Sequence, residues 1–477
     1  MATKKGRGRA AAGGGGGGGA RAAAGAGGGG AAASGVSSPV EELLLAALER
    51  GGEGFETGRF LVTFKEGAGA AGLESLGAQG MRVADARDFD GQAASLEAAG
   101  DADAFVMPEI GVAVIGAAAA EERAMSGAAE VAADSPYESI DPERFVFATG
   151  EYDRLAAGLF GSAGEAEGGP SGPGEQLRSA ARILEAIARE VYGTRQAPEV
   201  ESEPGAAVLG ATWGLTACKV PQSTRSGAGI KVAVLDTGVD FGHPDFVGRL
   251  PVAQSRTFVG QPVQDLHSHG THCIGTACGP KAPAGTTPRY GVGHQTTIFV
   301  GKVLTNSGFS VDGSVLAGMN WAVANRCQVI SMSLEGPGGP IPSYTAAGQA
   351  ALSNGLLMIA AAGNRAALTG QPANSPTIMS VASLDQNLTP SSFSNFGKIE
   401  IAAPGRDVFS SVPRPTRYGV KSGTSMAAPH VAGCAALWAQ TSASLRGTAL
   451  WQRLRSSARP LPFPATRVGA GLVQAPA

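Results

Sequence analysis

The C-terminal half of the sequence predicts an α/β fold, with a mostly parallel sheet covered by helices on both faces. Apolar, β-branched stretches typical of buried strands recur along the chain, and helical patterns lie between several of them. The strand-like stretches are 230–240, 297–304, 327–334, 356–364 and 378–384, and the helical ones are 271–279, 313–326 and 343–355. Strands that alternate with helices form parallel sheets, which bind ligands at the carboxyl ends of their strands.

The preceding residues predict a smaller α+β module behind a disordered tail. Residues 1–36 are a Gly/Ala-rich segment of low complexity. Ser38 and Glu41, with a proline between them, form a capping-box pattern that begins a short helix. A β-α-β…β pattern follows over residues 58–115.

These patterns divide the chain into four parts. The segment between the two folded parts contains a linker-like stretch at 161–175 and an amphipathic helical pattern at 177–191. The predicted parts are a disordered tail (1–36), a helix plus α+β module (37–116), a linker with an amphipathic helix (117–204) and the α/β domain (205–477).

Composition excludes several classes of protein. The net charge of −3 provides no basic field for nucleic acid, and no run of 18 apolar residues predicts a membrane span. The basic N-terminus is not followed by a leucine-rich segment, so no signal peptide is predicted. This favours the cytoplasm or export by another route, with an extracellular location as the alternative. The five scattered cysteines favour apolar filling over a metal site, and one disulfide is left open.

Three polar clusters stand where such a sheet binds ligands. Asp236 follows an apolar strand, His269 lies in HSHGTHCIG, and Ser425 lies in SGTSMAAPH just ahead of an apolar helical run. A serine hydroxyl becomes a nucleophile when a base removes its proton and a third group orients that base. Taken alone, Asp236 is equally well explained as a turn residue, whereas the three residue types together indicate nucleophilic catalysis.

Catalysis of this kind also needs donors for the oxyanion. Gly363 and Asn364 follow another apolar strand, where a side-chain amide would face the active site. The backbone amide of Ser425, at a helix N-terminus, is a second candidate donor. Without the other clusters, Asn364 would be interpreted as part of an ordinary Gly-Asn turn.

These motifs, in this order, resemble the subtilisin-like serine proteases (subtilases) over residues 205–475. The resemblance rests on VAVLDTGVDFGHPDF, HSHGTHCIGT, VISMSLEGP, AAAGN and SGTSMAAPHVAG. It implies a subtilisin-like fold and a triad of Asp236, His269 and Ser425, with Asn364 as the oxyanion amide. The pair His272-Cys273 is similar to the proteinase K branch. The implied substrate-binding residues are Ser333, Leu334, Glu335 and Gly363.

The resemblance also implies a serine endopeptidase that acts on proteins or peptides. Residues 58–115 are similar to a subtilase propeptide, which implies that the N-terminal region is an intramolecular inhibitor. The alternatives are a catalytically silent binding domain and a processing protease for one partner peptide. Glu335 stands where many relatives have glycine, and we expect it to favour basic or small polar substrate side chains.

The implied chemistry requires no cofactor, and the expectation for calcium rests on one residue. Asp245 matches a calcium ligand of the family. The loop that completes that site corresponds to residues 280–290, which offer no carboxylate, whereas calcium prefers several oxygen ligands. The sequence therefore leaves calcium as an alternative at Asp245.

Overall fold

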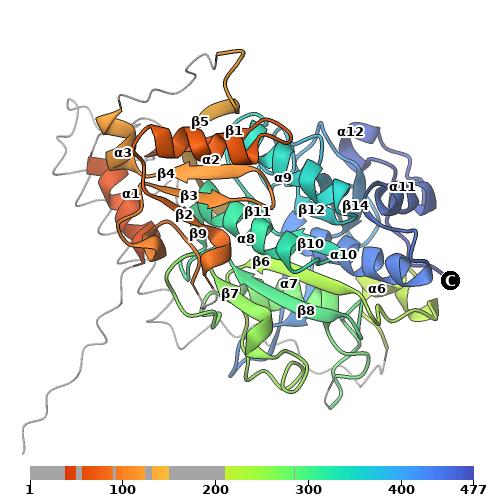
Figure 1. Ribbon diagram of the computed structural model, residues 1–477. Coiled ribbons are helices and arrows are strands. Elements are labelled where there is room, and N and C mark those ends of the chain that lie inside the picture. The colour runs from red at the N-terminus through yellow and green to blue at the C-terminus, as the bar shows by residue number, and fades with distance from the viewer. Residues whose placement is uncertain (1–37, 50–55, 90–92, 124–131, 150–209, 284) are drawn as a thin grey trace, which may run out of the picture. The chain divides into compact units, whose positions relative to one another are not determined.

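A seven-stranded parallel sheet forms the centre of the C-terminal domain (Figure 1). Its strand order is β14-β13-β12-β10-β6-β8-β7, and each adjacent pair is parallel. The five predicted strands are confirmed, while β7 and β14 were not predicted. The strands are β6 (Lys231–Asp236), β7 (Ser255–Thr257), β8 (Thr297–Lys302), β10 (Val329–Met332), β12 (Leu357–Ala361), β13 (Met379–Leu384) and β14 (Ile401–Pro404).

The computed structural model describes residues 38–49, 56–89, 93–123, 132–149, 210–283 and 285–477. The predicted disordered tail, the linker at 161–175 and the amphipathic helix at 177–191 lie outside these residues. All five cysteines lie within them, and each is buried and free.

Two apolar clusters show that helices cover both faces of the sheet, as the sequence predicts. On β6, Val232 and Val234 belong to a cluster with α7 and α10, whereas Ala233 and Leu235 belong to a cluster with α8 and α9. Successive side chains of a strand point to opposite faces, so each helix pair covers its own face. The helices of this domain are α6 (Trp213–Ala217), α7 (His269–Cys278), α8 (Asp312–Ala324), α9 (Pro342–Ser353), α10 (Thr424–Thr441), α11 (Gly447–Ser457) and α12 (Ala465–Val468).

A second, mainly antiparallel sheet forms the N-terminal module, which comprises the described residues between 38 and 148. Its strand path is β5-β1-β4-β3-β2, in which only β2 and β3 pair in parallel. The elements are α1 (Pro39–Glu49), β1 (Glu56–Phe64), α2 (Gly69–Ala78), β2 (Val83–Asp85), β3 (Ala104–Met107), β4 (Val112–Ile115), α3 (Ala117–Glu122) and β5 (Tyr137–Ala148). The predicted capping box of α1 is present, because Glu41 accepts a hydrogen bond from the amide of Ser38 at 2.8 Å.

The module extends beyond the boundary expected at residue 116. Strand β5 pairs with β1, and its last residues also pair with β9 (Phe309–Val311) and β11 (Leu334–Glu335) of the C-terminal domain. The described residues 117–123 and 132–148 therefore belong to the module, although they were expected to be part of a linker. Local patterning did not reveal β5 because its pairing partners lie far away in the sequence.

Candidate active site

Three elements bring the predicted catalytic residues to the carboxyl end of the parallel sheet. Asp236 is the last residue of β6, His269 is the first residue of α7, and Ser425 is the second residue of α10. All three are buried in the described structure. His269 follows Asp236 by 33 positions in the sequence (269 − 236), and Ser425 follows His269 by 156 (425 − 269). The alternation of strand and helix brings all three residues to one site.

Asp236 and His269 form a direct pair, with 2.7 Å between Asp236 Oδ1 and His269 Nδ1. Burial opposes ionisation of Asp236, but the charge and hydrogen bond of His269 outweigh it and lower the pKa of the carboxyl. Burial likewise opposes protonation of His269, but the charge of Asp236 outweighs it and raises the pKa of the imidazole well above its usual value. The carboxylate therefore fixes the ring and stabilises its protonated form.

Asp265, which sequence reasoning did not single out, shapes the turn that leads into His269. Its carboxylate accepts hydrogen bonds at 2.9 Å from the amides of His267, Ser268 and Thr271, and it is fully buried. Ser268 adopts a left-handed conformation with φ of 78°. The aspartate secures this turn. An aspartate four residues before His269 was the available signal.

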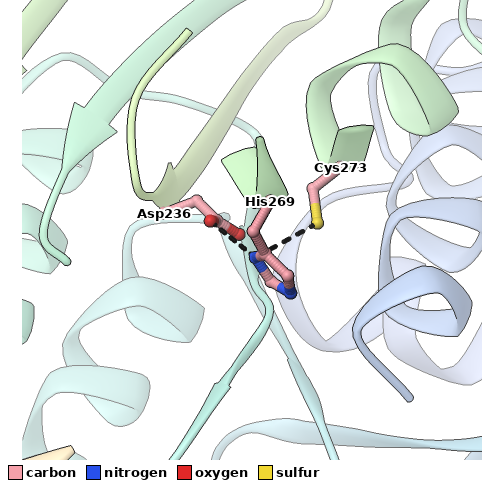
Figure 2. Close-up of side chains that lie close together, drawn as sticks. All are labelled: Asp236, His269 and Cys273. Atoms are coloured by element: carbon pink, nitrogen blue, oxygen red, sulfur yellow. Dashed lines mark hydrogen bonds and ion pairs between the residues drawn. The ribbon is translucent and has the colours of Figure 1, made fainter. Parts of the chain in front are cut away.

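Cys273 lies one helical turn after His269, with its sulfur beside the imidazole (Figure 2). Its sulfur is 3.9 Å from His269 Nδ1 and 3.5 Å from the carbonyl oxygen of Ser425. Ligand atoms of Asp236, His269 and Cys273 lie within 4.8 Å of one another, the arrangement needed for a metal site. However, Nδ1 already contacts Asp236, and burial raises the pKa of the Cys273 thiol, so a hydrogen-bonded cluster fits these residues better.

Ser425 lies in α10 with its carbonyl oxygen free of the helical ladder. Pro429, four residues later, has no N–H to donate to that oxygen. Ser333 Oγ donates to it at 2.8 Å instead, together with the Cys273 thiol. Pro429 thus lies inside the helix and frees the carbonyl of Ser425 for contacts with both neighbouring segments.

The hydroxyl of Ser425 points toward the end of β5. It donates to the carbonyl oxygen of Ser333 at 3.2 Å and contacts the hydroxyl of Thr149. His269 Nε2 is buried and makes no hydrogen bond within the described structure. Proton transfer from Ser425 to His269 therefore requires the serine hydroxyl to turn away from Ser333.

Asn364 lies beside Ser425 with a defined amide orientation. Its Oδ1 accepts hydrogen bonds at 2.8 Å from both the amide and the hydroxyl of Thr424. Its Nδ2 is therefore the group that can donate to an acceptor at the site. Gly423 permits this approach, since a Cβ there would lie 2.8 Å from Asn364 Nδ2.

The predicted substrate-binding residues lie along β11 and the turn after β12. Leu334 and Glu335 pair with β5, and the carbonyl of Ser333 accepts from the amide of Thr149 at 3.4 Å. The Glu335 carboxylate is buried and lies 3.4 Å from Arg365 Nε. A Cβ on Gly363 would collide with this carboxylate at 2.2 Å, which explains the glycine. Arg365, which sequence reasoning missed, thus balances the negative charge of Glu335.

The two other histidines of the predicted cluster are neighbours of the site. His272 is fully buried, and its Nε2 lies 2.9 Å from the carbonyl oxygen of Val408. Burial lowers its pKa well below the usual value, so it remains neutral. His267 has its ring 6.2 Å from that of His269, measured between centroids.

Asp245, the residue considered for calcium, is surrounded by hydrogen-bond donors. Tyr290 Oη donates to its carboxylate at 2.5 Å and Tyr418 Oη at 3.0 Å. Tyr290 comes from the loop that would complete the calcium site in relatives. Calcium prefers several carboxylate or carbonyl oxygens, whereas the side chains that contact this carboxylate are two neutral phenols. The described residues around Asp245 therefore do not fit calcium.

An α/β sheet with Asp, His and Ser at its carboxyl edge defines a hydrolase-type site. The sequence matches the subtilase family over residues 227–471, and the chain belongs to that family. It is 38% identical to subtilisin Savinase of Lederbergia lenta over 274 residues, which cover 56% of this chain and 97% of that protein.

Two further relatives show the same extent of similarity. The alkaline protease of Alkalihalobacillus alcalophilus is 38% identical over 274 residues, covering 56% of this chain and 69% of the relative. Subtilisin E of Bacillus subtilis is 35% identical over 258 residues, covering 52% of this chain and 65% of the relative. The chain thus spans slightly less than two thirds of subtilisin E. None of the described helices is long and apolar enough to cross a membrane.

Proposed function

We propose that this chain is a serine endopeptidase made as a self-inhibited precursor. Family membership and the Asp236–His269 pair beside Ser425 support the activity. In this proposal Ser425 attacks a peptide carbonyl and becomes acylated. His269 accepts the serine proton and returns it to the leaving amine, and water then hydrolyses the acyl-enzyme.

Asp236 and Asn364 complete the proposed chemistry. Asp236 keeps the imidazole in the required tautomer and stabilises the imidazolium. Asn364 Nδ2 and the backbone amide of Ser425 donate to the oxyanion that forms on the attacked carbonyl. A single donor of this kind contributes about 3–4 kcal/mol to transition-state stabilisation.

The observation that carries the self-inhibition is the position of β5. Its C-terminal residues lie between β9 and β11 and pair with both. The amide of Ala148 donates to the carbonyl of Gly308 at 2.7 Å, and Thr149 contacts Ser425. A strand held on both edges and ending at the nucleophile is how a peptide substrate would bind by strand addition. We therefore assign Thr149–Gly150 as the bond that the chain cleaves in itself.

Intact-mass spectrometry of the purified wild type beside Ser425→Ala tests this assignment. We expect the wild type to show a new terminus after Thr149 and the variant to remain uncut. A fluorophosphonate probe should label the processed wild type and fail to label the variant.

The two readouts separate the two parts of the proposal. If no processed form is ever labelled, the chain is a silent binding domain and the enzyme proposal is wrong. If labelling occurs but the new terminus lies elsewhere, the enzyme proposal holds and the assignment of β5 as its own substrate is wrong.

A further inference from the structure

The two faces of β5 are buried by different parts of the chain. Val146 and Ala148 belong to the apolar cluster built around α8 and α9 of the C-terminal domain. Phe145 and Phe147 alternate with them and belong to a separate cluster. Since alternate residues of a strand point to opposite faces, one set faces α8 and α9 and the other, on the outer face, points away from them.

The outward face meets an apolar surface of the C-terminal domain, which we call the outer patch: Val259, Phe309 and Val311. Phe147 lies directly opposite Phe309 in the β5–β9 register, and Phe145 lies opposite Val311. Directly opposed residues of an antiparallel pair share one face and contact each other. The rings of Phe145 and Phe309 are 6.5 Å apart between centroids and meet edge to face.

Helix α1 covers this cluster from the other side. Val40 and Leu44 of α1 are buried within it. Ser38 Oγ donates to the carbonyl of Val259 at 3.0 Å, and Glu41 accepts from Ser307 Oγ at 3.0 Å. The outer patch is therefore fully covered only while the chain's own N-terminal module is present.

We propose that the outer patch is a specificity site for substrates, and this rests on the proposed endopeptidase function. Removal of residues 38–149 would leave three apolar side chains beside the position of a bound strand. A substrate strand in the register of β5 would place the third residue before the scissile bond opposite Phe309, and the fifth opposite Val311 and beside the Phe309 ring. The patch thus selects bulky apolar side chains at these positions.

The test compares two chromogenic peptides on the processed enzyme. One is acylated Phe-Val-Phe-Ala-Thr p-nitroanilide, copied from residues 145–149, and the other has Ser at its third residue. We expect kcat/KM about tenfold higher for the first peptide, as is usual for one apolar group in a binding site. In Phe309→Ser the ratio should fall below about threefold, and Phe309→Leu should retain most of it.

Several controls keep this inference falsifiable. Titration with the fluorophosphonate probe corrects for differences in active enzyme, and Val247→Ser changes an exposed apolar side chain outside the patch. If Phe309→Ser does not accumulate as folded protein, the Val311→Ser enzyme is used instead. Its test peptide carries Ser at the fifth residue before the leaving group. Equal cleavage of both peptides by the wild type, or an unchanged ratio in the Phe309 and Val311 variants, overturns the inference. A lack of hydrolysis of both peptides overturns the proposed function instead.

Discussion

Asp312 and Glu143 meet across the boundary between the C-terminal domain and the N-terminal module. The amide of Arg144, next to Glu143, donates to Asp312 Oδ2 at 3.0 Å. In return, the amide of Gly313, next to Asp312, donates to Glu143 Oε1 at 3.0 Å. Both carboxyl groups are fully buried, and each accepts a hydrogen bond from the backbone amide of the residue that follows the other, Arg144 in β5 and Gly313 in α8.

This pair predicts that the N-terminal module is held more tightly in acid. Burial, with a smaller contribution from the charge of nearby Glu143, raises the pKa of Asp312 from 3.8 to about 7, against the opposing effects of Tyr344 and Arg144. Burial also raises the pKa of Glu143; the negative charge of Glu97 adds to this effect, and the positive charge of Arg59 opposes it. A carboxyl whose pKa is raised in the bound state takes up a proton on binding. The resulting stabilisation is present at low pH and is lost as the pH rises from about 4 to about 7.

Hydrogen exchange of the uncut Ser425→Ala chain measures this effect. We expect protection of the β5 amides, corrected for intrinsic exchange rates, to fall as the pH increases across this range. Asp312→Asn should flatten the dependence. Tyr344→Phe should preserve it and move it to higher pH, because Tyr344 lowers the pKa of Asp312. Protection that is independent of pH in the parent chain would contradict the prediction.

Asp236→Asn should change both the rate of peptide hydrolysis and its pH dependence. The charge of Asp236 raises the pKa of His269, and only the neutral imidazole can accept a proton. Activity of the parent therefore rises as the pH increases through that pKa. The variant should lose about 10⁴-fold in kcat, and its residual activity should reach a plateau at lower pH. A pH–rate profile of the processed enzyme measures both effects, and an unshifted acidic limb would contradict the role of Asp236.

Arg365→Gln should strengthen any preference of Glu335 for basic side chains immediately before the scissile bond. Arg365 Nε lies 3.4 Å from Glu335, and removing its charge leaves the carboxylate less well compensated. We expect kcat/KM for a lysine peptide over an alanine peptide to rise about tenfold. The double variant Glu335→Gln/Arg365→Gln should abolish this gain. If the double variant keeps the preference, Glu335 is not its source.

Tyr290→Phe should lower the stability of the fold, and the stability of the variant should not depend on calcium. Loss of the hydrogen bond to buried Asp245 should lower the free energy of unfolding by about 1–2 kcal/mol. Thermal unfolding with EDTA and with added calcium, in the parent and in Asp245→Asn, tests for a metal at this residue. A calcium-dependent rise in Tm that disappears in Asp245→Asn would show that calcium binds there.

The strands that end at the proposed catalytic residues were predictable because each is a short apolar run that stands out in the local sequence. β6 is an apolar run that ends at Asp236, and the glycine before Asn364 closes another such run. The helices that contain or directly follow His269 and Ser425 were expected from the same patterning, although α7 begins two residues earlier than predicted. Sequence periodicity was sufficient here because both faces of this sheet are buried by the chain's own helices.

The contacts that complete the site were not predictable in this way. β5 contains Pro142 and several charged residues, and it is a strand because β1, β9 and β11 pair with it. The pairing of Arg365 with Glu335 and of Tyr290 with Asp245 joins residues distant in sequence. Single-sequence patterning does not contain such information.

The burial of β5 on both faces affects the interval between self-cleavage and the appearance of activity. A cut after Thr149 would leave intact the hydrogen bonds to β9 and β11 and the cover supplied by α1. Cleavage and activation would then be separate events, and the slower one would be the departure of the severed segment. Freshly cut enzyme would show a lag before it attacks other proteins, and the length of that lag would depend on how firmly α1 holds.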